Sequence, residues 1–122
     1  MDYKIIRQGN NFVIYNKSIT VAYLYFKYAR DESKYRNIEL SYLHVNPRYR
    51  RQGIGTLLIK HFLKYFKERN IVWISLWTGK DIEITKGYTI YTKLGFKLAA
   101  KQKDYHAKGI ATRLLIKKLN NI

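Results

Sequence analysis

Short segments rich in β-branched and aromatic residues, separated by turn-forming clusters, fill the first third of the chain. This pattern predicts four strands, over residues 3–7, 12–15, 19–28 and 38–45. The polar segment between the last two strands is short enough to join them as an antiparallel pair.

A helical period follows, because apolar residues recur three and four positions apart while lysines occupy the other face. The apolar positions are Ile54, Leu57, Leu58, Phe62, Leu63 and Phe66. We expect this helix to end near Asn70. Residues 71–77 form an almost unbroken apolar run, which is typical of a central strand covered on both faces.

The remaining pattern predicts a weaker helix over residues 81–93, ended by Gly95, and a closing hairpin. Its strands cover residues 96–105 and 111–119, around Lys108 and Gly109. The 122 residues are then one domain, 1–122, of the α/β (α+β) class. The element order predicts a mixed twisted sheet of about seven strands with helices.

The most specific pattern is the string Val45-Asn46-Pro47-Arg48-Tyr49-Arg50-Arg51-Gln52-Gly53-Ile54-Gly55 between the fourth strand and the first helix. Such a connection points backbone N–H groups and the positive end of the helix dipole at one spot, which suits phosphate or pyrophosphate. Gly53 and Gly55 allow close approach of an anion because they lack a Cβ atom. Two turn glycines alone would also fit an ordinary strand-to-helix connection.

The whole string resembles the acetyl-CoA loop of the GNAT superfamily of acetyl-CoA-dependent N-acetyltransferases, with pattern Val-x-x-x-x-Arg-x-x-Gly-x-Gly or Ala. Val45, Pro47, Arg50, Gly53 and Gly55 all match. A second family element, Tyr-x-Lys-Leu-Gly-Phe, is matched by Tyr91-Thr92-Lys93-Leu94-Gly95-Phe96. The resemblance covers residues 38–96 well and implies a GNAT-like acyl-CoA N-acyltransferase fold.

The resemblance implies acetyl-CoA as co-substrate, with its pyrophosphate on the loop and its pantetheine arm beside the fourth strand. The implied binding residues are Leu43, His44, Val45, Arg50, Arg51, Gln52, Gly53, Ile54, Gly55 and Thr56. A backbone N–H near residues 43–45 would polarise the thioester carbonyl. No metal is expected, because the chain has no cysteine and its three histidines lack a carboxylate-rich neighbourhood.

Two residues are candidates for proton transfer. Tyr91 stands where the family places its general acid, although it could equally be one core aromatic among 12 tyrosines. Glu39, 14 residues before Gly53, interrupts an apolar strand and is the candidate base. A carboxylate paired with a lysine is the alternative for Glu39. His44 is the alternative base, or a histidine that only packs on the strand.

The chain departs from the family pattern at two places. Only a turn separates Arg7 from Phe12, so the usual pair of helices after the first strand is missing. This predicts an open acceptor site, able to take a macromolecular end or a protruding lysine. The family's frequent Asn, seven residues before the catalytic Tyr, is Ile84 here. The affinity for acetyl-CoA could therefore be lower than in members of the family that have this Asn.

The chain is strongly basic, with 24 Lys and Arg against 8 Asp and Glu and a net charge of +16. Such a field attracts polyanions and disfavours cationic acceptors such as aminoglycosides and polyamines. The acceptor amine is expected on an acidic protein, a peptide or RNA. Basic residues also crowd the last hairpin, at Lys97, Lys101, Lys103, Lys108, Arg113, Lys117 and Lys118, against Asp104. The alternative is that the positive charge reflects only the overall composition of the chain and no binding partner.

The sequence therefore predicts an N-acetyltransferase that transfers acetyl directly in a ternary complex, since no cysteine can carry the group. The alternative is a weakly active or non-catalytic module that binds acetyl-CoA, nucleic acid or both, with interleaved tyrosines as stacking surfaces. With no apolar stretch of 18 residues and no secretory leader, we expect a cytoplasmic protein without a membrane partner. Assembly into an oligomer stays open.

Overall fold

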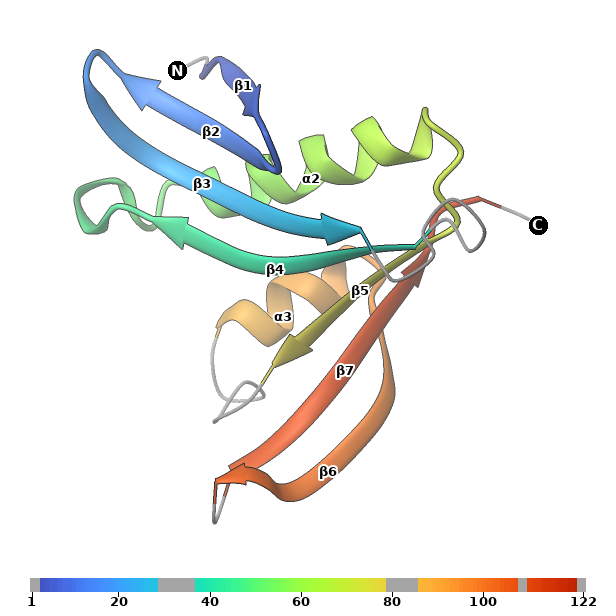
Figure 1. Cartoon of the computed structure of the whole chain (residues 1–122). Helices are drawn as coiled ribbons and strands as arrows, with labels where there is room; N and C mark the ends of the chain where they lie inside the picture. The colour runs from blue at the N-terminus through green and yellow to red at the C-terminus, as the bar shows by residue number, and fades with distance from the viewer. Residues whose placement is uncertain (1–2, 29–36, 79–85, 108–109, 121–122) are drawn as a thin grey trace.

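The computed structural model describes residues 3–28, 37–78, 86–107 and 110–120. Within these ranges seven strands form one sheet, in the order β1-β2-β3-β4-β5-β7-β6 (Figure 1). The strands are β1 (Ile5–Gln8), β2 (Asn11–Asn16), β3 (Ile19–Tyr28), β4 (Asn37–Val45), β5 (Trp73–Thr78), β6 (Lys97–Ala107) and β7 (Ile110–Lys118). The helical elements are η1 (Pro47–Tyr49), α2 (Ile54–Lys67) and α3 (Lys86–Lys93).

The predicted element order and the sheet of about seven strands are confirmed. β3 has the predicted bounds, and α2 begins at the predicted residue but ends at Lys67, before Asn70. The expected helical residues 81–85 and the expected turn at 108–109 lie outside the described residues. β6 and β7 pair antiparallel, as expected for the closing hairpin.

β4 and β5 are the parallel pair of the sheet, and they pair only at their beginnings. Asn37, Ile38 and Glu39 lie opposite Trp73, Ile74 and Ser75. Beyond these pairs the two strands diverge, as Figure 1 shows. The sheet therefore opens into a V along the second halves of both strands.

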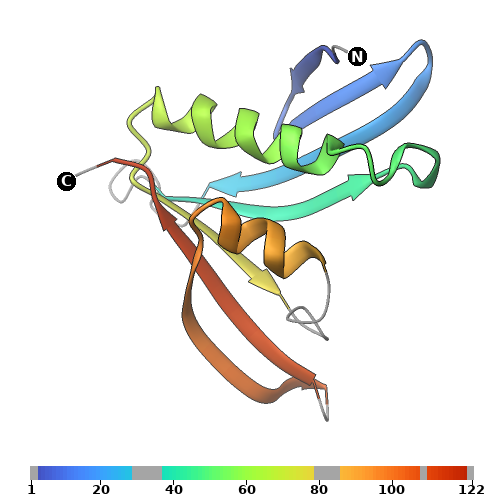
Figure 2. The same ribbon diagram turned by 180° about the vertical axis from the view of Figure 1, so that it is seen from behind.

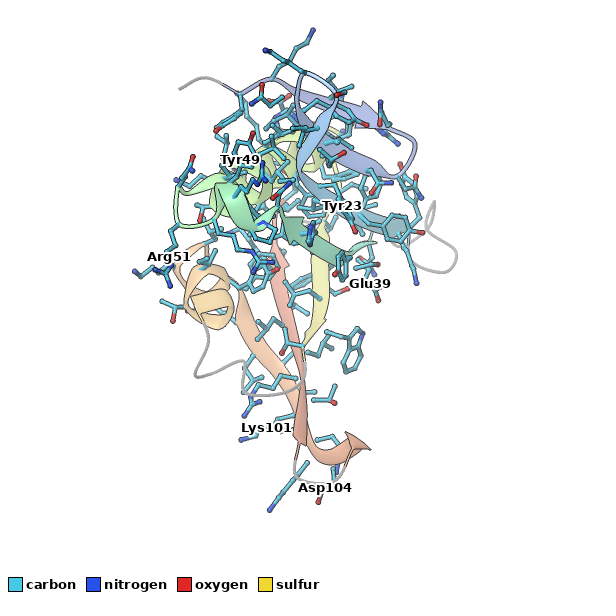
Figure 3. The ribbon with its side chains drawn as sticks, turned by 90° about the vertical axis from the view of Figure 1, so that its left-hand side faces the viewer. Tyr23, Glu39, Tyr49, Arg51, Lys101 and Asp104 are labelled. Carbon is cyan, nitrogen blue, oxygen red and sulfur yellow. The ribbon has the colours of Figure 1, made fainter. Side chains whose placement is uncertain are left out.

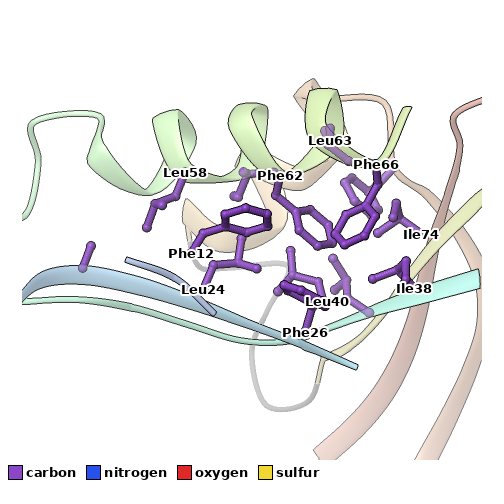
Figure 4. Close-up of a cluster of buried hydrophobic side chains, with 14 of the residues drawn as sticks. Phe12, Leu24, Phe26, Ile38, Leu40, Leu58, Phe62, Leu63, Phe66 and Ile74 are labelled. Carbon is purple, nitrogen blue, oxygen red and sulfur yellow. The ribbon is translucent and has the colours of Figure 1, made fainter. Parts of the chain in front are cut away.

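Both α-helices cover the same face of the sheet and lie in front of the strands in Figure 2. The amphipathic period of α2 explains its place, because its apolar face meets the apolar side chains of β2, β3 and β4 (Figure 4). Phe62 and Phe66 from α2 meet Phe26 of β3, with ring centroids 6.0 and 5.0 Å from its ring. Each fully buried Phe contributes about 1.5–3 kcal/mol, so this layer fixes α2 on the sheet.

The expectation that β5 is covered on both faces is wrong. Ile74 and Leu76 are buried toward the helices, but Trp77 on the other face is 55% exposed. The apolar run misled because a tryptophan adds apolar character to a sequence whether or not anything covers it. We call the sheet face opposite α2 and α3 the helix-free face.

A turn of Gly9 and Asn10 joins β1 to β2, so the expected pair of helices is missing at this point. Side chains of β3 and β4 are open on the helix-free face, where Tyr42 is 53% exposed. The open acceptor site stays a prediction.

The connection from β4 to α2 is fixed by local bonds. The Asn46 side chain accepts a hydrogen bond from the Arg48 N–H at 3.1 Å and donates one to the Thr20 carbonyl at 3.4 Å. Gly53 then caps α2 in the left-handed conformation, with φ 78°. Gly55 lies in the first turn, close under the end of β4.

The two glycines should respond differently to alanine. Gly53→Ala should lower the free energy of unfolding by about 1–2 kcal/mol, because a Cβ atom is strained at positive φ. At Gly55 a Cβ atom would meet Leu43 Cδ2 at 3.6 Å and Val45 Cγ2 at 3.7 Å, which is ordinary contact. Gly55→Ala should therefore be neutral or stabilising by up to about 1 kcal/mol. Urea unfolding measures both, and equal losses would contradict this account of the loop.

Candidate functional site

A cleft of about 610 Å³ lies between the end of β4, the following loop and the start of α2. It is lined by Tyr42, Leu43, His44, Val45, Tyr49, Arg50, Arg51, Gly53, Ile54, Gly55, Thr56 and Ile90. The structure thus brings together every sequence-predicted cofactor residue except Gln52. Tyr42, Tyr49 and Ile90 were missed, although Tyr49 stands inside the loop motif and Ile90 directly precedes Tyr91.

The start of α2 offers unpaired donors to this cleft. The Leu57 N–H donates to the Gly53 carbonyl at 3.0 Å and closes the first helical bond. The N–H groups of Ile54, Gly55 and Thr56 precede that bond and have no acceptor within the helix. Gly53 supplies no capping side chain, and the first turn carries no acidic residue. An anion is the natural partner for these groups.

The two loop arginines differ in what they contact. Arg50 Nε donates to the Val45 carbonyl at 3.0 Å, so this side chain braces the loop against the end of β4. Arg51 adopts a positive φ of 65° and is exposed, and Figure 3 shows its side chain on the helix-bearing side of the molecule. Arg51 is therefore the better placed of the two to meet an anion at the helix start.

The diverging end of β4 presents a strand edge to the cleft. The Asn46 N–H donates to the Val21 carbonyl at 2.8 Å and so points toward β3. Because peptide groups alternate in direction along a strand, those of Val45 and Leu43 point the other way. The contact of the Val45 carbonyl with Arg50 agrees with this direction. An extended ligand could pair with this edge, since β5 has already diverged.

Tyr91 lies in the last turn of α3, and the motif around it is a helix ending. Gly95 has a φ of 96°, and the Phe96 N–H donates to the Tyr91 carbonyl at 3.0 Å. This is the Schellman arrangement, in which the residue after the glycine packs back on the helix. The rings of Phe96 and Tyr91 meet edge to face at 5.6 Å. The spacing of Tyr91, Gly95 and Phe96 in the motif thus has a structural cause.

The Tyr91 side chain is largely buried, and burial raises its pKa to about 12. Its hydroxyl therefore keeps its proton at neutral pH. Tyr91 does not line the cleft, whereas its neighbour Ile90 does. The structure places α3 against the cleft but leaves the general-acid role of Tyr91 as a prediction.

Glu39 lies at the last paired position of β4, where the V begins. Its carboxylate accepts a hydrogen bond from Ser41 Oγ at 2.7 Å. Figure 3 shows Glu39 and Tyr23 on the helix-free side, away from Arg51. Lys27 is its cross-strand neighbour in β3, so the alternative of a lysine partner also has a structural basis.

His44 lines the cleft, but its ring packs among aromatic neighbours. The ring centroid is 5.5 Å from that of Tyr23 and 6.5 Å from that of Tyr42. This arrangement favours a packing role over a role as base. Ile84, which replaces the family's Asn, lies outside the described residues.

In the described part of the chain, no three His, Cys, Asp or Glu side chains lie closely enough together to hold a metal ion. None of the described helices is long and apolar enough to cross a membrane.

This chain is similar to known proteins in sequence and in fold. A relative, the uncharacterized N-acetyltransferase YedL of Escherichia coli (strain K12), is 31% identical over 67 residues. The match covers 55% of this chain and 42% of YedL, so it spans less than half of that protein.

Solved structures agree in fold. The ribosomal-protein-S18-alanine N-acetyltransferase of Escherichia coli superposes with a TM-score of 0.79 at 17% identity, over 95% of this chain and 74% of that one. A GNAT superfamily phosphinothricin acetyltransferase from Sinorhizobium meliloti, solved with acetyl-CoA, gives 0.75 at 19% identity, over 90% and 60%.

The model of one family matches residues 2–96, from the first strand through both sequence motifs and the end of α3. That segment holds the loop, the free strand edge and the Schellman ending that form the cleft and its border. The chain belongs to the acetyltransferase (GNAT) family.

Proposed function

We propose that this chain is an acetyl-CoA-dependent N-acetyltransferase that transfers acetyl directly to an amine. The observation that carries the proposal is the cleft, where an uncapped helix start and a free strand edge lie side by side. One suits a pyrophosphate and the other an extended amide-containing arm. Family membership and the acetyl-CoA complex of the Sinorhizobium meliloti enzyme support this assignment.

In this proposal the first-turn N–H groups of α2 and Arg51 hold the pyrophosphate, with Gln52 and Arg50 fixing the loop. The peptide edge of Leu43 and Val45 holds the pantetheine arm. An N–H from the same edge faces the thioester carbonyl and stabilises the charge that develops on its oxygen. Acetyl-CoA supplies the activated acetyl group.

Proton transfer falls to Glu39 and Tyr91. Glu39 takes a proton from the acceptor ammonium, directly or through water, so that the amine can attack the carbonyl carbon. As the carbon–sulfur bond breaks, the Tyr91 hydroxyl supplies the proton for the departing thiolate. The absence of cysteine from the whole sequence supports direct transfer.

We further propose that the acceptor amine belongs to an acidic protein, a peptide or RNA. The net charge of +16 and the open helix-free face support a large anionic acceptor. The alternative, a weakly active module that binds acetyl-CoA, is favoured by the position of Tyr91 outside the cleft lining. The variants described in the next paragraphs distinguish an active enzyme from such a module.

The cofactor site is tested by Gly53→Glu. A Cβ atom there meets no other protein atom within 4 Å, so the glutamate would have room to place its negative charge at the cleft, at the cost of the strain of a positive φ. Acetyl-CoA should no longer bind in calorimetry, and it should no longer raise the melting temperature. Arg48→Gln is the control, because it also lowers net charge by one unit but does not line the cleft. Unchanged affinity in the Gly53 variant would sink the cofactor assignment.

Tyr91→Phe keeps the ring packing and removes only the hydroxyl. Turnover with an acidic peptide that bears a free amine should fall by about 10²–10⁴-fold, while acetyl-CoA affinity stays near that of the unaltered protein. Tyr49→Phe, which removes another hydroxyl at the cleft, should change turnover little. If both variants turn over like the unaltered protein, Tyr91 is not the acid.

Glu39→Gln and His44→Gln distinguish the two candidate bases. Loss of the base should lower turnover by about 10²–10⁴-fold at neutral pH. The deficit should shrink as pH rises toward the pKa of the amine, about 10.4 for a lysine, because more amine is then neutral without help. We expect this profile for the Glu39 variant. The same profile in the His44 variant alone would reverse the assignment.

A further inference from the structure

The helix-free face carries a cluster of rings on β3 and β4. Tyr23 lies opposite His44 in register, and Tyr25 lies opposite Tyr42. The Tyr23 and Tyr42 rings stack at 5.8 Å, with 24° between their planes. Together with Asn11 the three tyrosines line a hollow of about 350 Å³, which we call the tyrosine hollow. The hollow is shallow and open, so a planar ring would lie against the tyrosine rings.

A second hollow lies across the V, on β5, β7 and β6. It measures about 240 Å³ and is lined by Trp77, Ala100, Lys101, Gln102 and Thr112, and we call it the tryptophan hollow. Trp77 is 55% exposed. Thr112 is 2% exposed, and among the described residues its hydroxyl has no hydrogen-bond partner. A buried hydroxyl without a partner at an exposed tryptophan indicates a place for a polar ligand.

Glu39 lies between the two hollows along the sheet. It shares β4 with Tyr42 and is paired with Ser75 of β5, two residues before Trp77. Side chains two apart on a strand share a face, so Glu39, Ser75 and Trp77 open on the same side. A ligand that fills both hollows would therefore pass over the proposed base.

Two lysines border the same path. Lys27 is the cross-strand neighbour of Glu39, and Lys118 Nζ lies 5.7 Å from the centre of the Trp73 ring. Two cations accompany one acid here, which agrees in sign with the whole chain. This face is thus suited to a ligand with phosphates and planar rings.

We propose that the helix-free face binds single-stranded RNA, with one base in the tyrosine hollow, another on Trp77, and phosphates on the two lysines. Ring faces interleaved with cations are the elements that hold single strands without regard to sequence. The two ring surfaces favour a strand that carries bases over an acidic peptide, which matches only the lysines. The inference rests on the proposed function in one respect, because an amine carried by the RNA would reach Glu39.

Fluorescence anisotropy with a labelled 12-nucleotide RNA of mixed sequence, without acetyl-CoA, tests the stacking. Tyr42→Ala and Trp77→Ala should each weaken binding by about 5- to 100-fold, the range of one stacking contact. Tyr28→Ala is the matched control, because Tyr28 is 44% exposed but packs on Phe26 and Phe66 on the helix side. Equal losses in all three variants would overturn the proposal.

Charge is tested by two double variants with the same net charge. Changing Lys27 and Lys118 to Gln should reduce the salt slope of RNA binding by about 1.4, at 0.7 per phosphate contact. The same change at Lys60 and Lys64, exposed on α2, should leave the slope unchanged. Equal slopes in the two variants, or competition by polyglutamate as strong as by unlabelled RNA, would overturn the assignment to RNA.

This result can be separated from the proposed function. Gly53→Glu should keep RNA binding while losing acetyl-CoA, since Gly53 lines the cleft and not the tyrosine hollow, and Tyr42 is the one residue that lines both. A protein that binds acetyl-CoA but no RNA would overturn only this inference. A protein that binds RNA but no acetyl-CoA would overturn only the proposed function.

Discussion

The early end of pairing between β4 and β5 is the constraint on which the rest of the structure depends. Three register pairs hold the strands together, after which each is held by its other neighbour. β4 keeps its pairing with β3 to Val45, and β5 keeps its pairing with β7 to Thr78. The peptide groups that would have joined the two strands are thereby left facing a gap.

The gap places several features together that are distant in sequence. The loop after β4 delivers the start of α2 to its mouth, and the phenylalanine layer under α2 holds that helix end in place. Glu39 is at the last pair, on the other face of the sheet. A thioester on one side and an amine on the other would therefore meet in the V. The proposed chemistry needs this separation, because each reactant has its own approach.

Local patterns explain which parts of this arrangement were predictable. Alternation and helical period depend on near neighbours, so β3 and the start of α2 followed from the sequence. Most of the cleft lining followed from the resemblance of the loop motif, which did not include Tyr42, Tyr49 or Ile90. The motif at Tyr91 to Phe96 is likewise local, since it encodes a helix ending through Gly95.

Non-local features were not predictable in the same way. The irregular register between Tyr25 and Phe26, opposite Ser41, brings Tyr42 onto the helix-free face, and no residue pattern announces it. Trp77 is exposed because neither α2 nor α3 covers the face on which it lies, and the residues around Trp77 do not indicate this. The hydrogen bond from Arg50 to the Val45 carbonyl depends on how the loop folds. It gives this motif arginine a structural role.

Amide hydrogen exchange followed by NMR, with and without acetyl-CoA, tests the central claim that the diverged edge of β4 and the start of α2 form one binding site. Acetyl-CoA should slow exchange at Leu43 or Val45 and at residues 54–56 together. Exchange in β1 and β2, which lie at the far edge of the sheet, should not change. Protection at the helix start without any at Leu43 or Val45, or none at either, would contradict the account.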